Sequence, residues 1–309
     1  MIPPVAHFIW FGSELPWVSQ LALRSARRHG GFERVVLHHD GRLTLAASAE
    51  GWARKDDIEL ETIDPKTLFA NAGIEPDAMM ELYSSLEAPS ARANVVRAAI
   101  LAGEGGVYLD CDTITIRSLE SLRAQGAFCG RERVVYPSTV ARSQRLKLAK
   151  LRSSVRRLLA LTPGGWRVFR QIEGLYPAAE NNAVLGAEAG HPFVRGLLRA
   201  MVEVPPERRR VRFALGTHLL QEWVATYEGE GLEVHPPFVF YPLGPAISQH
   251  WFRLGGAPSL DEVLDERTRI VHWYASVENE ALVSGIDEAY VRAHADRQLF
   301  SALALRYAL

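Results

Sequence analysis

The chain has 309 residues, of which 48% are hydrophobic and 23% charged, and its formal net charge is −1. This near-neutral balance gives no electrostatic bias toward nucleic acid, and no apolar run approaches the roughly 20 residues that span a bilayer. Its start shows no signal peptide, and Cys111 and Cys129 are too few for a disulfide framework or a cysteine-based zinc site. We therefore expect residues 1–309 to form one cytoplasmic domain of an α/β enzyme.

The first part of the chain predicts alternating strands and helices. Residues 6–11 form an apolar and aromatic run with the length of a buried strand. Residues 34–39, with Val-Val-Leu at their centre, and residues 58–63, which alternate, predict two further strands. Between the first two, residues 21–29 predict a short helix that ends at a pair of glycines. Strand, helix and strand at short spacing favour a parallel, doubly wound sheet that begins at residue 5.

The next block ends in a group of acidic residues. Ser90 follows a proline and is expected to cap a helix over 91–102. A glycine-rich turn ends that helix, and residues 107–109 predict a buried strand with Asp110 and Asp112 at its carboxyl end. Ligands bind outside the carboxyl ends of strands in open α/β sheets, so this position predicts a functional site.

The second half of the chain has a different character. Residues 142–170 contain many cations and no acid, within what we expect to be a basic helical insertion at 138–180. Apolar residues recur there at helical spacing, which predicts one amphipathic helix; they are Leu148, Leu151, Val155 and Leu158. Further on, we expect a helix at 193–203, a strand at 270–273 and a final helix over 286–307.

The motif Asp110-Cys111-Asp112 suits the chemistry of a departing diphosphate. Negative charge grows on that group as the bond to it breaks, and a divalent cation neutralises the charge. Mg²⁺ and Mn²⁺ prefer oxygen ligands such as carboxylates and phosphates. Two Asp residues separated by one residue at a strand end can hold such a metal–phosphate unit. We expect Cys111 to be inert, with its side chain turned away from the two carboxylates.

Residues 91–116 resemble the DXD-containing sugar-transferase family, through the run ARANVVRAAILAGEGGVYLDCDTITI. That family includes the initiating α-1,6-mannosyltransferase of yeast N-glycan outer chains and the glucosylating domains of large cytotoxins. Three further segments are similar to the family and follow its order: AHFIWFG at 6–12, NNAVLGAEAGHPF at 181–193 and HWYAS at 272–276. The resemblance implies a GT-A-type fold, namely a doubly wound mixed sheet with an added helical subdomain.

The resemblance also implies roles for residues on the donor side. Trp10 would stack on the nucleobase, and Tyr108 would line the nucleotide pocket. Asp110 would contact the ribose or the donor sugar, and Arg97 would reach that sugar and the phosphates. Asn182 would touch the donor sugar. Asp110, Arg97 and Asn182 are therefore the expected catalytic residues.

The same resemblance implies a metal site for Mn²⁺ or Mg²⁺. Asp112 and His272 would be its ligands, and Ser276 would contact the diphosphate. Asn94 would share the donor pocket with Arg97, three residues further along one helix face. The family has a Ser-Asp pair where this chain has Ala93-Asn94. An amide forms weaker hydrogen bonds to a sugar than a carboxylate does, so this departure bears on donor choice.

Each of these residues also has a purely structural interpretation. Trp10 and Tyr108 lie in apolar runs and fit a core. Arg97 fits a solvated helix charge, and Asn182 fits a helix cap. His272, in an apolar strand, fits a buried and hydrogen-bonded histidine.

The implied reaction is transfer of a sugar, with retained configuration, from a nucleotide-diphosphate sugar to a hydroxyl of a carbohydrate, glycolipid or protein acceptor. A UDP-sugar is the favoured donor and GDP-mannose the second candidate. Attack on the same face of the sugar as the departing phosphate is preferred over a covalent glycosyl-enzyme, because no carboxylate stands out as a nucleophile. The basic segment would bind an anionic acceptor or make peripheral contact with an anionic membrane at its cytoplasmic face. The structural alternative is a solvated amphipathic helix with neither role.

Two other functions fit the same motif. A phosphatase of the haloacid-dehalogenase type would use Asp110 as its nucleophile and Asp112 as its acid/base. That motif normally closes the first strand of its domain, whereas here a strand-helix-strand block precedes it. The second alternative is a non-catalytic module that binds nucleotide sugars.

Overall fold

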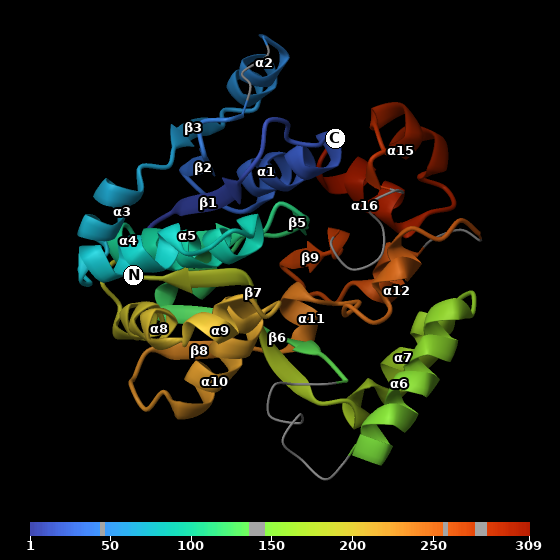
Figure 1. The fold of residues 1–309 in the computed structure, drawn as a ribbon. Coiled ribbons are helices and arrows are strands. Elements are labelled where there is room, and N and C mark those ends of the chain that lie inside the picture. Colours follow the sequence, from blue (N-terminus) through green and yellow to red (C-terminus); the bar gives the residue numbers. More distant parts are fainter. Residues whose placement is uncertain (44–46, 136–145, 256–258, 276–282) are drawn as a thin grey trace.

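The computed structural model describes residues 1–43, 47–135, 146–255, 259–275 and 283–309. Among these residues, a seven-stranded sheet of order β3-β2-β1-β4-β7-β6-β8 forms the centre of the molecule (Figure 1). β1, β2, β3 and β4 run parallel, whereas β7 is antiparallel to both β4 and β6. The expected α/β fold with a doubly wound mixed sheet is therefore confirmed. The strands of this sheet are β1 (Val5–Trp10), β2 (Arg34–His39), β3 (Glu59–Thr62), β4 (Gly106–Leu109), β6 (Ala127–Arg133), β7 (Ala178–Ala187) and β8 (Leu232–His235).

Helices cover both faces of the sheet, and apolar side chains fill the two layers between them. One layer joins α3, α4, α5, α8 and α10 to the sheet, and the other joins α1 and α11 to its opposite face. The inner parallel strands β1, β2 and β4 are therefore largely buried on both faces, which explains the apolar residues in them, whereas the edge strand β3 is partly exposed. The helices are α1 (Trp17–His29), α2 (Ala47–Lys55), α3 (Pro65–Asn71), α4 (Pro76–Ser84), α5 (Pro89–Gly103), α6 (Leu146–Leu161), α7 (Gly165–Ile172), α8 (Pro192–Glu203), α9 (Pro206–Arg209), α10 (Leu219–Thr226), α11 (Pro237–Phe240), α12 (Leu260–Val263), α15 (Glu288–His294) and α16 (Leu299–Tyr307).

The expected strands all form, but some helix boundaries were wrong. α5 begins at Pro89 with Ala88 in the capping position, so Ser90 is not the N-cap. Proline suits the first turn because it lacks the N–H that would have no partner there. α1 begins four residues before the predicted start, at Trp17.

Two predicted long helices are each divided in two. The basic helix ends at Leu161 because Pro163 cannot continue it and Gly164 adopts a φ of +69°, and α7 then begins. Residues 142–145 of that prediction lie outside the described part of the chain. The final helix is interrupted at Gln298, whose backbone is extended and whose side chain bonds Phe252 O and Tyr290 Oη, both at 2.9 Å. In the part of the chain that the structure describes, no helix is both long and apolar enough to cross a membrane.

A second, two-stranded sheet connects the main sheet to the C-terminal part of the chain. β5 (Thr113–Thr115) follows β4 after a short turn and pairs antiparallel with β9 (Ile270–His272). The third apolar cluster surrounds this pair and includes side chains of α1, α7 and α16. Because Thr113 pairs with His272, this sheet brings His272 beside Asp112 at the end of β4.

Two buried histidines link β1 to β2 and to the turn before β4. His7 Nδ1 lies 3.0 Å from His38 Nε2, and His7 Nε2 lies 3.0 Å from the carbonyl oxygen of Gly105. Burial is the main cause that lowers the pKa of His7 to about 4 and that of His38 to about 3. Both rings are therefore neutral in the folded protein at neutral pH.

We expect this pair to make folding stability depend on pH. Below the ordinary histidine pKa of 6.5, the unfolded chain binds protons that the folded pair does not, so stability is full above pH 6.5 and falls toward pH 4. At about 1.4 kcal/mol per pH unit, each of the two rings should account for a loss of about 3 kcal/mol between pH 6.5 and pH 4. Urea unfolding from pH 7 to pH 4 measures it, with His38→Gln for comparison. Carboxylates protonate in both proteins, so an equal slope in the variant would contradict the prediction.

Candidate functional site

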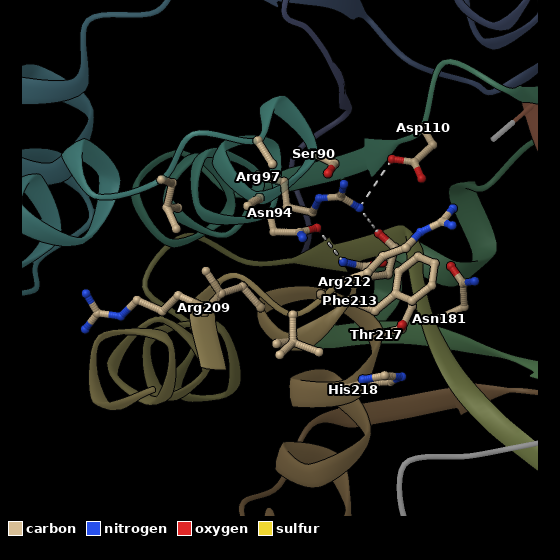
Figure 2. A pocket seen from close by; sticks show the side chains of 18 of the residues that line it. Ser90, Asn94, Arg97, Asp110, Asn181, Arg209, Arg212, Phe213, Thr217 and His218 are labelled. Carbon is tan, nitrogen blue, oxygen red and sulfur yellow. Dashed lines mark hydrogen bonds and ion pairs between the residues drawn. The ribbon is translucent and has the colours of Figure 1, made fainter. Parts of the chain in front are cut away.

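A cavity of about 900 Å³ opens beside the carboxyl end of β4 (Figure 2). Its lining comes from α5, β6, β7, the segment before α10 and the residues around β9. Six of the residues singled out from the sequence line this one cavity: Asn94, Arg97, Asp110, Asp112, Asn182 and His272.

Asp110, Asp112 and His272 form a cluster that could hold a metal ion. One ligand atom from each lies within 4.8 Å of the others. Asp112 Oδ1 is 2.9 Å from His272 Nε2, and its Oδ2 accepts a hydrogen bond of 2.9 Å from the Ala275 N–H. Burial alone would raise the pKa of Asp112, but His272 and the Ala275 N–H together lower it. Burial alone would lower the pKa of His272, but the Asp112 carboxylate raises it overall.

Arg97 connects α5 to β4 and β7. Its guanidinium lies 4.2 Å above the ring of Tyr108 and 3.3 Å from Asp110 Oδ1, and it donates a hydrogen bond to the carbonyl oxygen of Asn182 (Figure 2). The side chain is only 7% exposed, so the solvated-charge interpretation is wrong. Tyr108 Oη donates a 2.6 Å hydrogen bond to Asp110 Oδ1. Tyr108 is not among the residues that line the cavity. Both residues therefore fix the Asp110 carboxylate.

Asn182 and Asn94 meet across the cavity wall. Asn182 lies within β7, so the helix-cap interpretation is wrong, and its Nδ2 donates a 2.8 Å hydrogen bond to Asn94 Oδ1. The backbone of Gly216 packs closely against these two side chains. A Cβ at that position would lie 2.9 Å from Asn94 Nδ2 and 3.3 Å from Asn182 Nδ2. Only a residue without a side chain lets the backbone approach so closely.

The cavity also contains a buried acid that the sequence analysis missed. Glu132, in β6, lines the cavity and accepts a 2.7 Å hydrogen bond from Tyr274 Oη. Burial raises its pKa above the ordinary value. Tyr274 has a φ of +60°, an unfavourable conformation for a bulky residue. A single Glu near the end of a strand carries no sequence signal, and only the approach of β9 brings Tyr274 to it.

Three other singled-out residues lie outside this group. Trp10 ends β1 and does not line the cavity; within the described part of the chain its buried Nε1 has no hydrogen-bond partner. Cys111 turns its thiol toward the Ile9 carbonyl oxygen, at 3.6 Å, and away from the aspartates, as expected. Ser276 lies outside the described residues.

A second cavity, of about 440 Å³, lies at the carboxyl ends of β1, β2 and β3. Phe11 and Tyr83 contribute aromatic side chains to it, and Asp40 contributes a carboxylate. Glu87 lines both cavities, so the two adjoin at this residue.

The family model described as "Glycosyltransferase sugar-binding region containing DXD motif" matches residues 23–129. This segment holds Asn94, Arg97, Asp110 and Asp112, which meet in the larger cavity. This match identifies residues 23–129 as the sugar-binding region of a glycosyltransferase. Both the resemblance to the DXD-containing family and the expectation of an enzyme of this class are thereby confirmed.

Solved structures of glycosyltransferases share part of this architecture. The PaToxG glycosyltransferase is 16% identical over 72% of this chain and 69% of its own, with a TM-score of 0.46. Mouse xyloside xylosyltransferase 1 in its apo form is 13% identical over 89% of this chain and 98% of its own, with a TM-score of 0.47. The UDP-bound glycosyltransferase domain of the YGT toxin is 10% identical over 65% and 62%, with a TM-score of 0.35. No curated protein matches the chain.

The contact between Gly216 and the two asparagines yields a stability prediction. In Gly216→Ala, the new Cβ should displace Asn94 and break its hydrogen bond to Asn182, lowering the free energy of unfolding by about 1–2 kcal/mol. Gly174→Ala is the matched control, because no heavy atom lies within 4 Å of its added Cβ. Urea unfolding of both variants measures the difference. An equal effect of the two substitutions would show that the close approach is unimportant.

Proposed function

We propose that this glycosyltransferase moves a sugar from a nucleotide-diphosphate donor, a UDP-sugar in the first instance, to an acceptor hydroxyl with retention of configuration. The observation that carries the proposal is the cluster of Asp110, Asp112 and His272 in a cavity large enough for a sugar diphosphate. Drug-sized ligands occupy cavities of about 300–1,000 Å³.

The donor set of the cluster fits a divalent metal ion. It offers two carboxylates and one imidazole, and within the described residues His272 Nδ1 is buried without a hydrogen-bond partner. Mg²⁺ strongly prefers oxygen ligands, so the imidazole favours Mn²⁺ over Mg²⁺. Asp112 and His272 would hold the ion, and Asp110 would contact it or the sugar beside it. The ion would supply positive charge to the departing diphosphate.

The two adjoining cavities suit the two halves of such a donor. Phe11 and Tyr83 offer faces on which a nucleobase can stack in the smaller cavity, and Asp40 can accept a hydrogen bond from it. The predicted stacking role of Trp10 would require its ring to reach the same cavity from the end of β1. The sugar and diphosphate would lie in the larger cavity, where Arg97 and Asn182 can bind their oxygens.

Catalysis would depend on stabilising the charge that develops as the glycosidic bond breaks. Arg97 is held in place before any substrate binds, so it would reorganise little during the reaction. We favour attack by the acceptor on the same face as the departing phosphate, which takes the proton of the acceptor hydroxyl. Glu132 is the carboxylate that could form a covalent glycosyl-enzyme instead, and a trapped adduct on it would contradict same-face attack.

The alternatives are less well supported by the geometry. The phosphatase motif normally closes the first strand of its domain, but Asp110 follows β4, which comes after three other strands in the chain. Release of UDP or GDP from nucleotide sugars, against release of phosphate from an aryl phosphate, separates the two enzymes. If the protein binds the donor but catalyses neither reaction, it is a non-catalytic module that binds nucleotide sugars.

We predict that a UDP-sugar and Mn²⁺ together raise the melting temperature of the protein. A ligand that binds only the folded state at 100 times its Kd adds about 2.7 kcal/mol of stability. Asp112→Asn should weaken Mn²⁺ binding at least tenfold, because it removes one charged ligand, and should abolish UDP release. Asp296→Asn, at an exposed position, is the control. Thermal shift and UDP release with and without EDTA measure these effects, and activity unchanged by EDTA would refute metal dependence.

A specific observation favours peripheral contact with an anionic membrane as a second feature. Five large apolar residues of α6 face solvent: Leu148, Leu151, Val155, Leu158 and Leu161 are between 36% and 65% exposed. Lys147, Lys150 and Arg157 are exposed on the same helix, and the sequence has no acid from 142 to 172. Figure 1 shows α6 and α7 side by side at one edge of the molecule. Such a helix can lie in the plane of an anionic bilayer surface.

We therefore expect the protein to sediment with vesicles that contain phosphatidylglycerol and much less with pure phosphatidylcholine. Leu151→Glu combined with Leu158→Glu should reduce binding at least tenfold, because it adds negative charge and removes apolar contact. Leu254→Glu, at a 54% exposed position outside α6, should bind normally. Equal binding to both kinds of vesicle, or none, would remove the membrane proposal.

A further inference from the structure

The wall of the larger cavity between α9 and α10 carries exposed residues that the donor does not require. Arg210, Arg212 and Phe213 line the cavity, and all three are exposed to solvent. In Figure 2, Arg212 and Phe213 lie together, below Asp110 and above His218 in the view. The Arg212 guanidinium lies 4.6 Å above the Phe213 ring, so a cation and an aromatic face are presented side by side.

Phe213 is held in an unfavourable backbone conformation. Its φ is +68°, and its carbonyl oxygen accepts hydrogen bonds from the N–H groups of Gly216 at 3.0 Å and His218 at 3.2 Å. The residue is nevertheless 48% exposed, so little burial offsets the strain. Strained residues of this kind cluster at ligand-binding sites, where the surrounding structure holds them in place. Gly216, packed against Asn94 and Asn182, anchors the segment to the donor side of the cavity.

The arginines of the segment 208–212 fall into two groups. Arg208 pairs with Glu222 at 3.5 Å, and Arg209 donates hydrogen bonds to the backbone oxygens of Val202 and Val204. Across the described residues, no ion pair is found for Arg210 or Arg212. The donor diphosphate would already meet the metal cluster and Arg97. Two further cations at the mouth of the cavity therefore fit a second anionic group.

We propose that Arg210, Arg212 and Phe213 form an acceptor subsite for a saccharide that bears a phosphate or carboxylate. The guanidinium groups would bind the anionic group through charge-assisted hydrogen bonds. The exposed ring of Phe213 would pack against the apolar face of the sugar, with a hydroxyl directed toward the donor site. This inference rests on the proposed function, because it places an acceptor beside a nucleotide-sugar site.

The test is calorimetric binding to protein saturated with UDP and Mn²⁺. Glucose 1-phosphate and glucuronic acid are the anionic probes, glucose is the neutral probe, and inorganic phosphate tests the anion alone. We expect at least one anionic sugar to bind at least tenfold more tightly than glucose and than phosphate. Arg210→Gln combined with Arg212→Gln should lower the affinity for that sugar at least tenfold and change the affinity for UDP by less than twofold. Arg208→Gln, which is absent from the cavity wall, is the matched control.

Phe213→Gly separates a binding role from a structural one. Glycine adopts a φ near +68° without strain, so this variant should melt at the same or a higher temperature. It should nevertheless lose at least tenfold in affinity for the anionic sugar. A lower melting temperature with unchanged sugar affinity would show that the ring is only structural and would overturn its part in the subsite.

The remaining outcomes also decide the proposal. Weaker UDP binding by tenfold or more in the double arginine variant would assign these cations to the donor and overturn the acceptor subsite. Equal affinity for glucose and both anionic sugars, or no binding of any sugar, would overturn it as well. If inorganic phosphate binds as tightly as the sugar phosphate, the saccharide part is wrong. Failure of the wild-type protein to bind UDP would instead refute the proposed function.

Discussion

The contact between Asp112 and His272 determines how the site is assembled. It joins residues 160 positions apart in the chain, and it forms only because β5 and β9 pair in the observed register. Removing a carboxylate from water is costly unless it has hydrogen-bond partners. Asp112 has two, His272 Nε2 and the Ala275 N–H, which together bring its pKa below the ordinary value. The C-terminal part of the chain therefore completes a cluster that residues 23–129 alone do not contain.

On the other side of the cavity, Arg97 likewise joins parts of the chain that are distant in sequence. A buried guanidinium needs partners, and it finds the Asp110 carboxylate, the face of Tyr108 and the Asn182 carbonyl oxygen. These partners belong to β4 and β7, so one side chain of α5 ties together the two strands that run antiparallel at the centre of the sheet. Asp110 is consequently fixed by Arg97 and Tyr108, whereas Asp112 is fixed by β9. The two aspartates of one short motif are therefore held by different parts of the fold.

The sequence predicted what depends on local pattern. Buried parallel strands have continuous apolar sequences, so the strands and the position of Asp110 and Asp112 at a strand end could be found without the structure. Helix boundaries failed where one residue decided them, as Pro89 did for α5 and Gly164 did for α6. Glu132 and Gly216 could not be found, because their significance arises from contacts with Tyr274 and Asn94, which are distant in sequence. The solvent exposure of the apolar residues of α6 could not be predicted either, since their helical spacing suits a core as well as a solvent-facing surface.

The distribution of backbone strain gives independent support for the position of the site. In the described ranges of the chain, three residues other than glycine have a positive φ: Asp57, Phe213 and Tyr274. Aspartate tolerates this conformation, but for the two aromatic residues it is costly. Phe213 and Tyr274 line the same cavity, one at its exposed mouth and one against the buried Glu132. A fold selected for stability alone would place glycine or asparagine at such positions. The Tyr274 ring is buried and therefore also contributes to the core, whereas the half-exposed Phe213 is better explained by what it presents to the cavity than by what it adds to folding.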